Sequence, residues 1–157
     1  MTRSLVAGVG NLFFGDDGFG VEVARQLATT PPTNATVTDF GIRAIHLAYE
    51  LLNPVSLCIV ADCMSRGGDP GTLYVLEPEL DGGFPMPIAD AHGMSLTTVF
   101  SALRELGGVV PPMLIVGCEP EVTELGIGLS PSVRLAVPAA VELIRELVIT
   151  HNNKELP

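Results

Sequence analysis

Residues 8–20 read GVGNLFFGDDGFG and carry the clearest structural pattern in the sequence. An apolar run at residues 5–7 precedes it, and residues 21–27 follow with the apolar spacing typical of an amphipathic helix. A strand, a glycine-rich loop and a helix in this order open many nucleotide-binding α/β domains. This loop, however, carries the adjacent acids Asp16 and Asp17 and contains no Lys or Arg.

The loop does not fit a phosphate site. The dinucleotide fingerprint GxGxxG requires a third glycine, but that position holds Phe13. A P-loop requires a lysine that is absent here, and two carboxylates would repel a pyrophosphate. We therefore expect the loop to present carboxylates to a cation, and we expect Asp16 or Asp17 to help cap the following helix.

The length, net charge and cysteine content limit the classes to which the protein can belong. The 157 residues suit one domain, and we expect a single domain over residues 1–157 with a frayed polar tail at residues 151–157. The net charge of −10 argues against a nucleic-acid or anionic-membrane partner. No apolar run approaches the roughly 20 residues of a membrane-spanning helix. Three cysteines without a CxxC pair are typical of a reducing compartment, so we expect a cytoplasmic protein. Its oligomeric state is open, with a monomer as the default expectation.

Short apolar runs alternate with helical stretches along the chain. We expect strands at residues 5–9, 35–38, 55–61, 72–76 and 114–117, and helices at residues 21–28, 44–52, 95–106 and 130–149. Pro138 predicts a kink in the last helix. Nearly continuous apolar strands alternating with helices predict an α/β protein with a mostly parallel sheet covered on both faces. The longest irregular stretch, residues 77–94, is typical of a functional loop.

Three polar residues follow strands or precede a helix where a site can form. Functional groups in parallel sheets gather beyond the carboxyl ends of the strands. Asp17 lies in the loop after the first strand, Asp62 ends the apolar run 56–61, and His92 stands just before a predicted helix. Two carboxylates and an imidazole suit a borderline divalent ion such as nickel, zinc or manganese. Each residue also has a simpler explanation, because an aspartate can end a turn and a histidine can serve as a structural hydrogen-bonding residue.

The cysteines offer a second chemistry. Cys63 or Cys118 could act as a thiolate nucleophile with His92 as its base, since both thiols follow strand ends. Cys58, inside a strand, is expected to fill the core. No basic residue lies nearby in the sequence to lower the pKa of either thiol, and the GxSxG elbow of serine hydrolases is absent.

The same residues resemble a known family, the nickel–iron hydrogenase maturation endopeptidases, which are hydrogenase maturation proteases. The resemblance runs from residue 5 to about residue 144 and rests on GVGNLFFGDDGFG, IVADCM, the loop around His92, VGCEP and IGLSPSV, in this order. It implies a three-layer α/β/α sandwich with a mostly parallel central sheet. It also implies cleavage of the C-terminal extension from a hydrogenase large-subunit precursor after nickel insertion, with the nickel carried by the substrate. The family's metal-binding acids and histidine fall on Asp17, Asp62 and His92.

One segment departs from the family. After the second strand many members read Asp-Gly-Gly-Thr, whereas residues 39–43 read DFGIR. We expect a different substrate-facing loop here, in which Arg43 either contacts a carboxylate of the precursor or remains a solvated surface residue.

The resemblance leaves the hydrolytic step and two further functions open. The metal could polarise the scissile carbonyl or activate a water, or Asp17 or Asp62 could act as general base. One alternative is a non-catalytic chaperone that senses nickel in the same precursor. The other is a cysteine-dependent, amidase-like hydrolase that uses Cys63 or Cys118 with His92.

Overall fold

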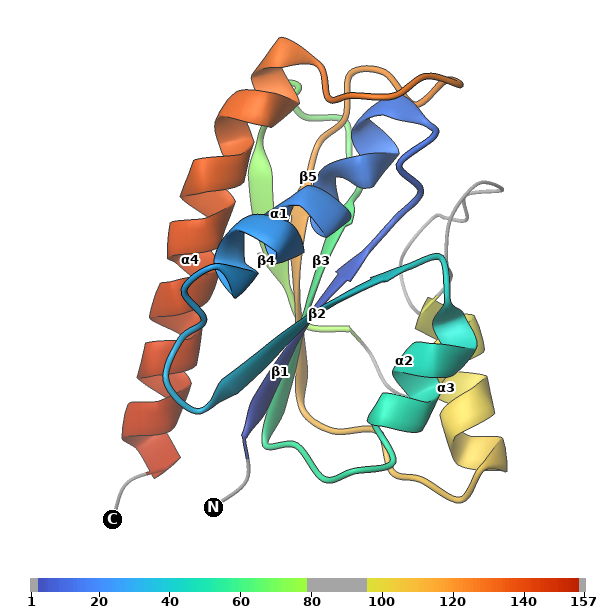
Figure 1. The fold of residues 1–157 in the computed structure, drawn as a ribbon, viewed down its shortest axis with the longest axis vertical. Helices are drawn as coiled ribbons and strands as arrows, with labels where there is room; N and C mark the ends of the chain where they lie inside the picture. Colours follow the sequence, from blue (N-terminus) through green and yellow to red (C-terminus); the bar gives the residue numbers. More distant parts are fainter. Residues whose placement is uncertain (1–2, 79–95, 156–157) are drawn as a thin grey trace.

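The computed structural model describes residues 3–78 and 96–155, and its centre is a five-stranded sheet in the order β2-β1-β3-β5-β4 (Figure 1). The strands are β1 Ser4–Val9, β2 Ala35–Gly41, β3 Leu57–Cys63, β4 Leu73–Leu76 and β5 Met113–Cys118. The helices are the short 3-10 helix η1 Gly15–Gly18 and the α-helices α1 Phe19–Ala28, α2 Ala44–Glu50, α3 Leu96–Glu105 and α4 Pro131–Glu155. Pairing is parallel except between β4 and β5. The predicted α/β class with a mostly parallel sheet is therefore confirmed.

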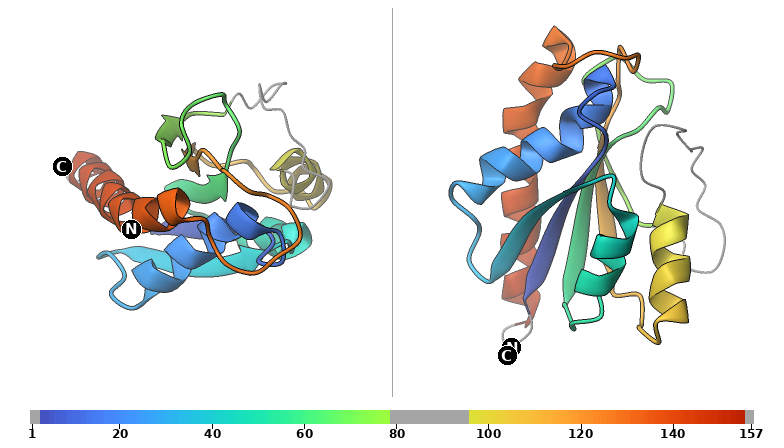
Figure 2. Two further views of the ribbon diagram at one scale, coloured as in Figure 1. Left: turned by 90° about the horizontal axis from the view of Figure 1, so that it is seen from above. Right: turned by 45° about the vertical axis from the view of Figure 1, so that its right-hand side comes forward.

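Helices cover both faces of the sheet, which gives the three layers that the resemblance implies. Helices α1 and α4 lie on one face, and α2 and α3 lie on the other (Figures 1 and 2). Along β1, Val6 packs towards α1 and α4, while its neighbours Leu5 and Ala7 pack towards α2 and α3. Burial on both faces is why the central strands read as continuous apolar runs rather than alternating ones.

The last helix is longer than the sequence predicts. It begins at Pro131 as expected, because proline is favoured at the first helical position, but it continues to Glu155 instead of ending near residue 149. Residues 151–155, which the sequence analysis assigned to a polar tail, thus form the last turns of α4. These turns are held by tertiary contacts: Asn152 Nδ2 donates to the Thr33 carbonyl at 2.9 Å, and His151 Nε2 lies 3.0 Å from Ser56 Oγ. No helix in the described ranges is long and apolar enough to cross a membrane.

The glycines of the opening loop serve packing. A Cβ on Gly20 would overlap the carbonyl oxygens of Val9 and Ala61, so only glycine lets α1 approach β1 and β3 this closely. Gly10 has a φ of 134°, and a Cβ there would overlap the Asp17 carbonyl. Close packing of the backbone therefore explains the glycines at positions 10 and 20. These glycines do not imply a phosphate-binding site.

Candidate functional site

The carboxyl edge of the sheet brings Asp17 and Asp62 together around Gly10. Asp17 is buried in η1, and its Oδ2 accepts a hydrogen bond from the Asn11 N–H at 2.8 Å. Asp62 lies half-buried in β3, and its Oδ1 accepts from the Cys63 N–H at 2.7 Å. A Cβ built on Gly10 would overlap the Asp17 carbonyl and lie 3.7 Å from Asp62 Oδ1. Two of the three predicted site residues thus lie beside Gly10 at one edge of the sheet, Asp17 through its main-chain carbonyl and Asp62 through its carboxylate, as the strand-end rule predicts.

The third predicted residue, His92, lies outside the described residues, and its place in the site stays a prediction. Within residues 3–78 and 96–155, no three His, Cys, Asp or Glu side chains converge as metal ligands. The two carboxylates alone offer oxygen donors, and an imidazole beside them would complete the mixed oxygen and nitrogen set that suits a borderline divalent ion.

Asp16 ties the opening loop to a distant segment. It is fully buried, and it accepts hydrogen bonds from the N–H groups of Glu121 at 2.8 Å, Val122 at 2.9 Å and Ser130 at 2.7 Å. The Ser130 hydroxyl donates to it as well, at 2.8 Å. Burial acts to raise the pKa of Asp16, but these hydrogen bonds outweigh it and hold the pKa below its usual value.

The expectation that one of the two aspartates caps the following helix is therefore wrong. Neither η1 nor α1 has a side-chain cap. Asp16 is turned towards residues 121–130, and Asp17 accepts from Asn11 on the preceding loop. The adjacent acids have different partners and, we infer, different roles.

Backbone hydrogen bonds complete the tie between the opening loop and residues 121–130. Gly15 N–H donates to the Gly126 carbonyl, and Gly126 N–H donates to the Phe13 carbonyl, both at 2.8 Å. Asp16 N–H donates to the Val122 carbonyl at 2.7 Å. The two loops thus form one hydrogen-bonded unit beyond the carboxyl ends of β1 and β5.

Glu119 is a buried carboxylate that the sequence analysis did not single out. It accepts hydrogen bonds from the Tyr74 hydroxyl at 2.7 Å and from the N–H groups of Arg66 at 2.8 Å and Gly68 at 3.1 Å. Burial acts to raise its pKa, but these donors outweigh it and hold the pKa below its ordinary value. The signal was available, since Glu119 directly follows an apolar strand just as Asp62 ends one.

The thiols are poorly suited to nucleophilic chemistry. Burial raises the pKa of Cys58 to about 12, and burial with the charges of Asp16 and Glu119 raises the pKa of Cys118 to about 12. For Cys63, burial and then the charges of Asp62, Asp17 and Asp16 raise the pKa strongly. A thiolate is the reactive form, so this environment disfavours the cysteine-hydrolase alternative.

Arg43 supports the turn between β2 and α2. Its Nε donates to the Phe40 carbonyl at 2.9 Å and its Nη2 to the Asp39 carbonyl at 2.6 Å. The side chain is exposed and follows the carboxyl end of β2. A contact between Arg43 and the precursor stays a prediction.

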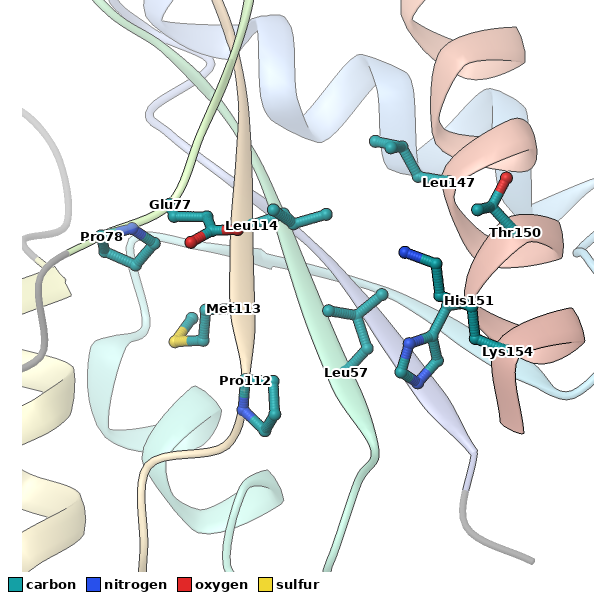
Figure 3. Close-up of a pocket in the computed structure, with 10 residues that line it drawn as sticks. All are labelled: Leu57, Glu77, Pro78, Pro112, Met113, Leu114, Leu147, Thr150, His151 and Lys154. Atoms are coloured by element: carbon teal, nitrogen blue, oxygen red, sulfur yellow. The ribbon is translucent and has the colours of Figure 1, made fainter. Parts of the chain in front are cut away.

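A cavity of about 340 Å³ lies at the opposite, amino edge of the sheet (Figure 3). Its floor includes Leu57 at the start of β3 and Met113 at the start of β5, and the last turns of α4 flank it. Neither Asp17 nor Asp62 lines it. Its size suits a small ligand, but the predicted chemistry lies at the other edge.

Comparisons with known proteins find relatives over most of the chain. The family model described as HycI, hydrogenase maturation protease, matches residues 21–147. The hydrogenase 2 maturation protease of Escherichia coli K12 is 32% identical over 145 residues, covering 90% of this chain and 88% of the relative.

Solved structures agree with that result. The hydrogenase-maturating endopeptidase HybD from E. coli superposes with a TM-score of 0.78 at 29% identity, covering 95% of this chain and 93% of that one. The nickel–iron hydrogenase maturation protease HycI from Thermococcus kodakarensis gives a TM-score of 0.71 at 26% identity, covering 94% and 92%.

Proposed function

The chain belongs to the hydrogenase maturation protease family, and from this premise we propose that it removes the C-terminal extension of a nickel–iron hydrogenase large-subunit precursor after nickel insertion. Membership of the family makes the protein a peptidase. The observation that supports the finer proposal is that Asp17 and Asp62 both lie beside Gly10 at the carboxyl edge.

In this proposal the nickel arrives as part of the substrate. Asp17, Asp62 and His92 reach it there, and they recognise a precursor that already holds its metal. Carboxylate oxygens and an imidazole nitrogen suit such an ion. The Asn11 and Cys63 N–H groups orient the two carboxylates before the substrate binds.

Hydrolysis requires a water to attack the scissile carbonyl and lose a proton. We propose that Asp17 or Asp62, both at the carboxyl edge where the substrate's nickel would bind, accepts that proton and returns it to the leaving amine as the C–N bond breaks. The substrate's nickel can assist by polarising the carbonyl or by acidifying the water. The raised thiol pKa values favour this chemistry over a cysteine nucleophile.

The test is a cleavage assay on nickel-loaded and nickel-free precursor, read by intact mass. The wild type is compared with Asp17→Asn, Asp62→Asn and His92→Ala, and with Asp69→Asn as a matched control on an exposed loop. We expect only the nickel-loaded precursor to lose a C-terminal peptide, the three site variants to fail, and the control to cleave normally. Cys63→Ala and Cys118→Ala are expected to retain cleavage. Binding of the precursor without shortening would instead support the chaperone alternative.

A further inference from the structure

The loop that Asp16 anchors turns apolar side chains outward. Leu125 and Ile127 are each 80% exposed, Val122 is 44% exposed, and Phe13 on the opening loop is 59% exposed. Isolated exposed apolar residues are common, but these four lie on two loops that are hydrogen-bonded to each other. We call the set of Phe13, Val122, Leu125 and Ile127, together with Glu121 and Glu124 on the same segment, the docking surface.

The docking surface is held in place by inward-facing polar contacts. Its backbone is bound to Asp16 and to the Phe13 and Gly15 peptide groups, as described above. A Cβ on Gly15 would lie 2.6 Å from the Val122 carbonyl, so the two loops also approach closely. Backbone polar groups of this segment are thus bonded within the protein, while the four apolar side chains and the carboxylates of Glu121 and Glu124 face solvent. Exposed apolar side chains on a backbone that hydrogen bonds hold in place are typical of a surface that a partner covers.

The surface borders the proposed site. Phe13 lies four residues before Asp17 on the opening loop, and Asp16, beside Asp17, anchors the other half of the surface. Seen from above, the loop before α4 passes beside the opening loop and η1 at one end of the molecule (Figure 2, left). A protein held by Asp17 and Asp62 would extend over these side chains.

The charge of the surface limits what can cover it. Residues 119–129 contain Glu119, Glu121 and Glu124 and no Lys or Arg, and Glu121 and Glu124 are exposed, while the Arg134 guanidinium of α4 donates to the Leu129 carbonyl at the end of this segment. A second copy of this chain would bring the same acids face to face across a two-fold axis, and each copy carries a net charge of −10. A partner with apolar side chains flanked by Lys or Arg matches the surface instead.

We propose that the docking surface binds the body of the hydrogenase large-subunit precursor through an apolar patch flanked by basic residues. This rests on the proposed function, because it places the substrate beside the same site. The docking surface contributes affinity, while Asp17 and Asp62 act on the nickel and the scissile bond. Its loss therefore raises KM and leaves kcat unchanged.

The experiment measures affinity and cleavage separately. Affinity for nickel-loaded precursor is measured by calorimetry on the full chain, with Leu125→Ser, Ile127→Ser and the double variant. Val109→Ser is the matched control, since Val109 is 82% exposed and lies near the start of β5 at the other edge. We expect the double variant to weaken Kd at least about tenfold and the control to leave it unchanged. Circular dichroism verifies that each variant is folded.

A charge variant probes the acidic part of the surface independently. Glu121→Lys with Glu124→Lys is compared with Glu146→Lys, an exposed glutamate on α4. We expect the double reversal to slow association, most strongly at low salt, and the control to have a smaller effect.

Four outcomes distinguish the docking proposal from the peptidase proposal. Weaker binding in the surface variants supports the docking proposal even if the wild type never shortens the precursor, in which case only the peptidase proposal fails. Unchanged affinity and KM with normal cleavage overturns the docking surface and leaves the peptidase standing. A wild type that neither binds nor cleaves overturns both. If the variants instead convert a wild-type dimer to monomer in sedimentation without changing precursor affinity, the surface joins two copies and the proposal is wrong.

Discussion

The two edges of the sheet differ in the chemistry of the side chains that they carry. At the carboxyl edge, buried carboxylates accept dense hydrogen bonds from loops, with Asp16 receiving four. At the amino edge, a cavity of about 340 Å³ lies among mostly apolar strand ends and the last turns of α4 (Figure 3). The cavity and the candidate catalytic site therefore lie at opposite edges of the sheet, so a cavity does not by itself mark the site of chemistry. Charged groups gather where parallel strands and loop N–H groups converge, and that is the carboxyl edge.

We expect the largest difference between variants at the two edges to be in cleavage activity. Asp62→Asn keeps the shape of the side chain but removes its charge, so we expect cleavage of nickel-loaded precursor to fall about 100-fold or more. Thr150→Ala and Lys154→Ala alter exposed residues that line the cavity and should cleave like the wild type. The measurement is kcat/KM by intact mass. Equal losses in both groups would show that the cavity belongs to the reaction.

The next effect concerns the stability of the carboxyl edge. Asp16→Ala leaves the N–H groups of Glu121, Val122 and Ser130 without their acceptor, which we expect to lower the free energy of unfolding by about 3 kcal/mol. Urea denaturation followed by circular dichroism measures this. Asp69→Asn on the exposed loop is the control and should change little. A wild-type midpoint in Asp16→Ala would mean that the loops do not depend on the anchor.

A smaller effect depends on pH. Because the pKa of Glu119 in the folded state lies below its ordinary value, its charge stabilises the fold fully at neutral pH, and this stabilisation is lost as the pH falls through the folded-state pKa. We expect Glu119→Gln to be less stable than wild type at pH 7, with the gap in unfolding free energy narrowing as the pH falls below the ordinary pKa of a glutamate. Urea midpoints across this range provide the test. A gap that stays constant with pH would contradict the assignment.

The smallest effect lies at the amino edge. Ser56 Oγ and His151 Nε2 lie 3.0 Å apart and join the start of β3 to the last turns of α4. Ser56→Ala should cost about 1 kcal/mol of unfolding free energy and leave precursor cleavage unchanged. Thermal unfolding and the cleavage assay check the two parts separately. Lost cleavage at wild-type stability would link this edge to function.

Much of the fold could be predicted from local sequence. Continuous apolar runs marked every central strand, and Pro131 marked the start of α4, because the pattern of one short window decides whether it is helix or buried strand. The strand-end rule also placed Asp17 and Asp62 at one edge. Helix α4 was predicted too short because its last turns are polar and their partners, Thr33 and Ser56, lie about a hundred residues earlier.

Local sequence patterns were sufficient to predict the class of sheet and the edge that carries Asp17 and Asp62, and the motifs were sufficient to identify the family. Only the tertiary structure distinguished Asp16 from Asp17, since the four bonds that anchor Asp16 join residues 105 to 114 positions apart. The same holds for Glu119, whose partners precede it by 45 to 53 positions. Periodicity reports the conformation of a local segment, whereas the partner of a buried carboxylate depends on which loops the sheet order brings together.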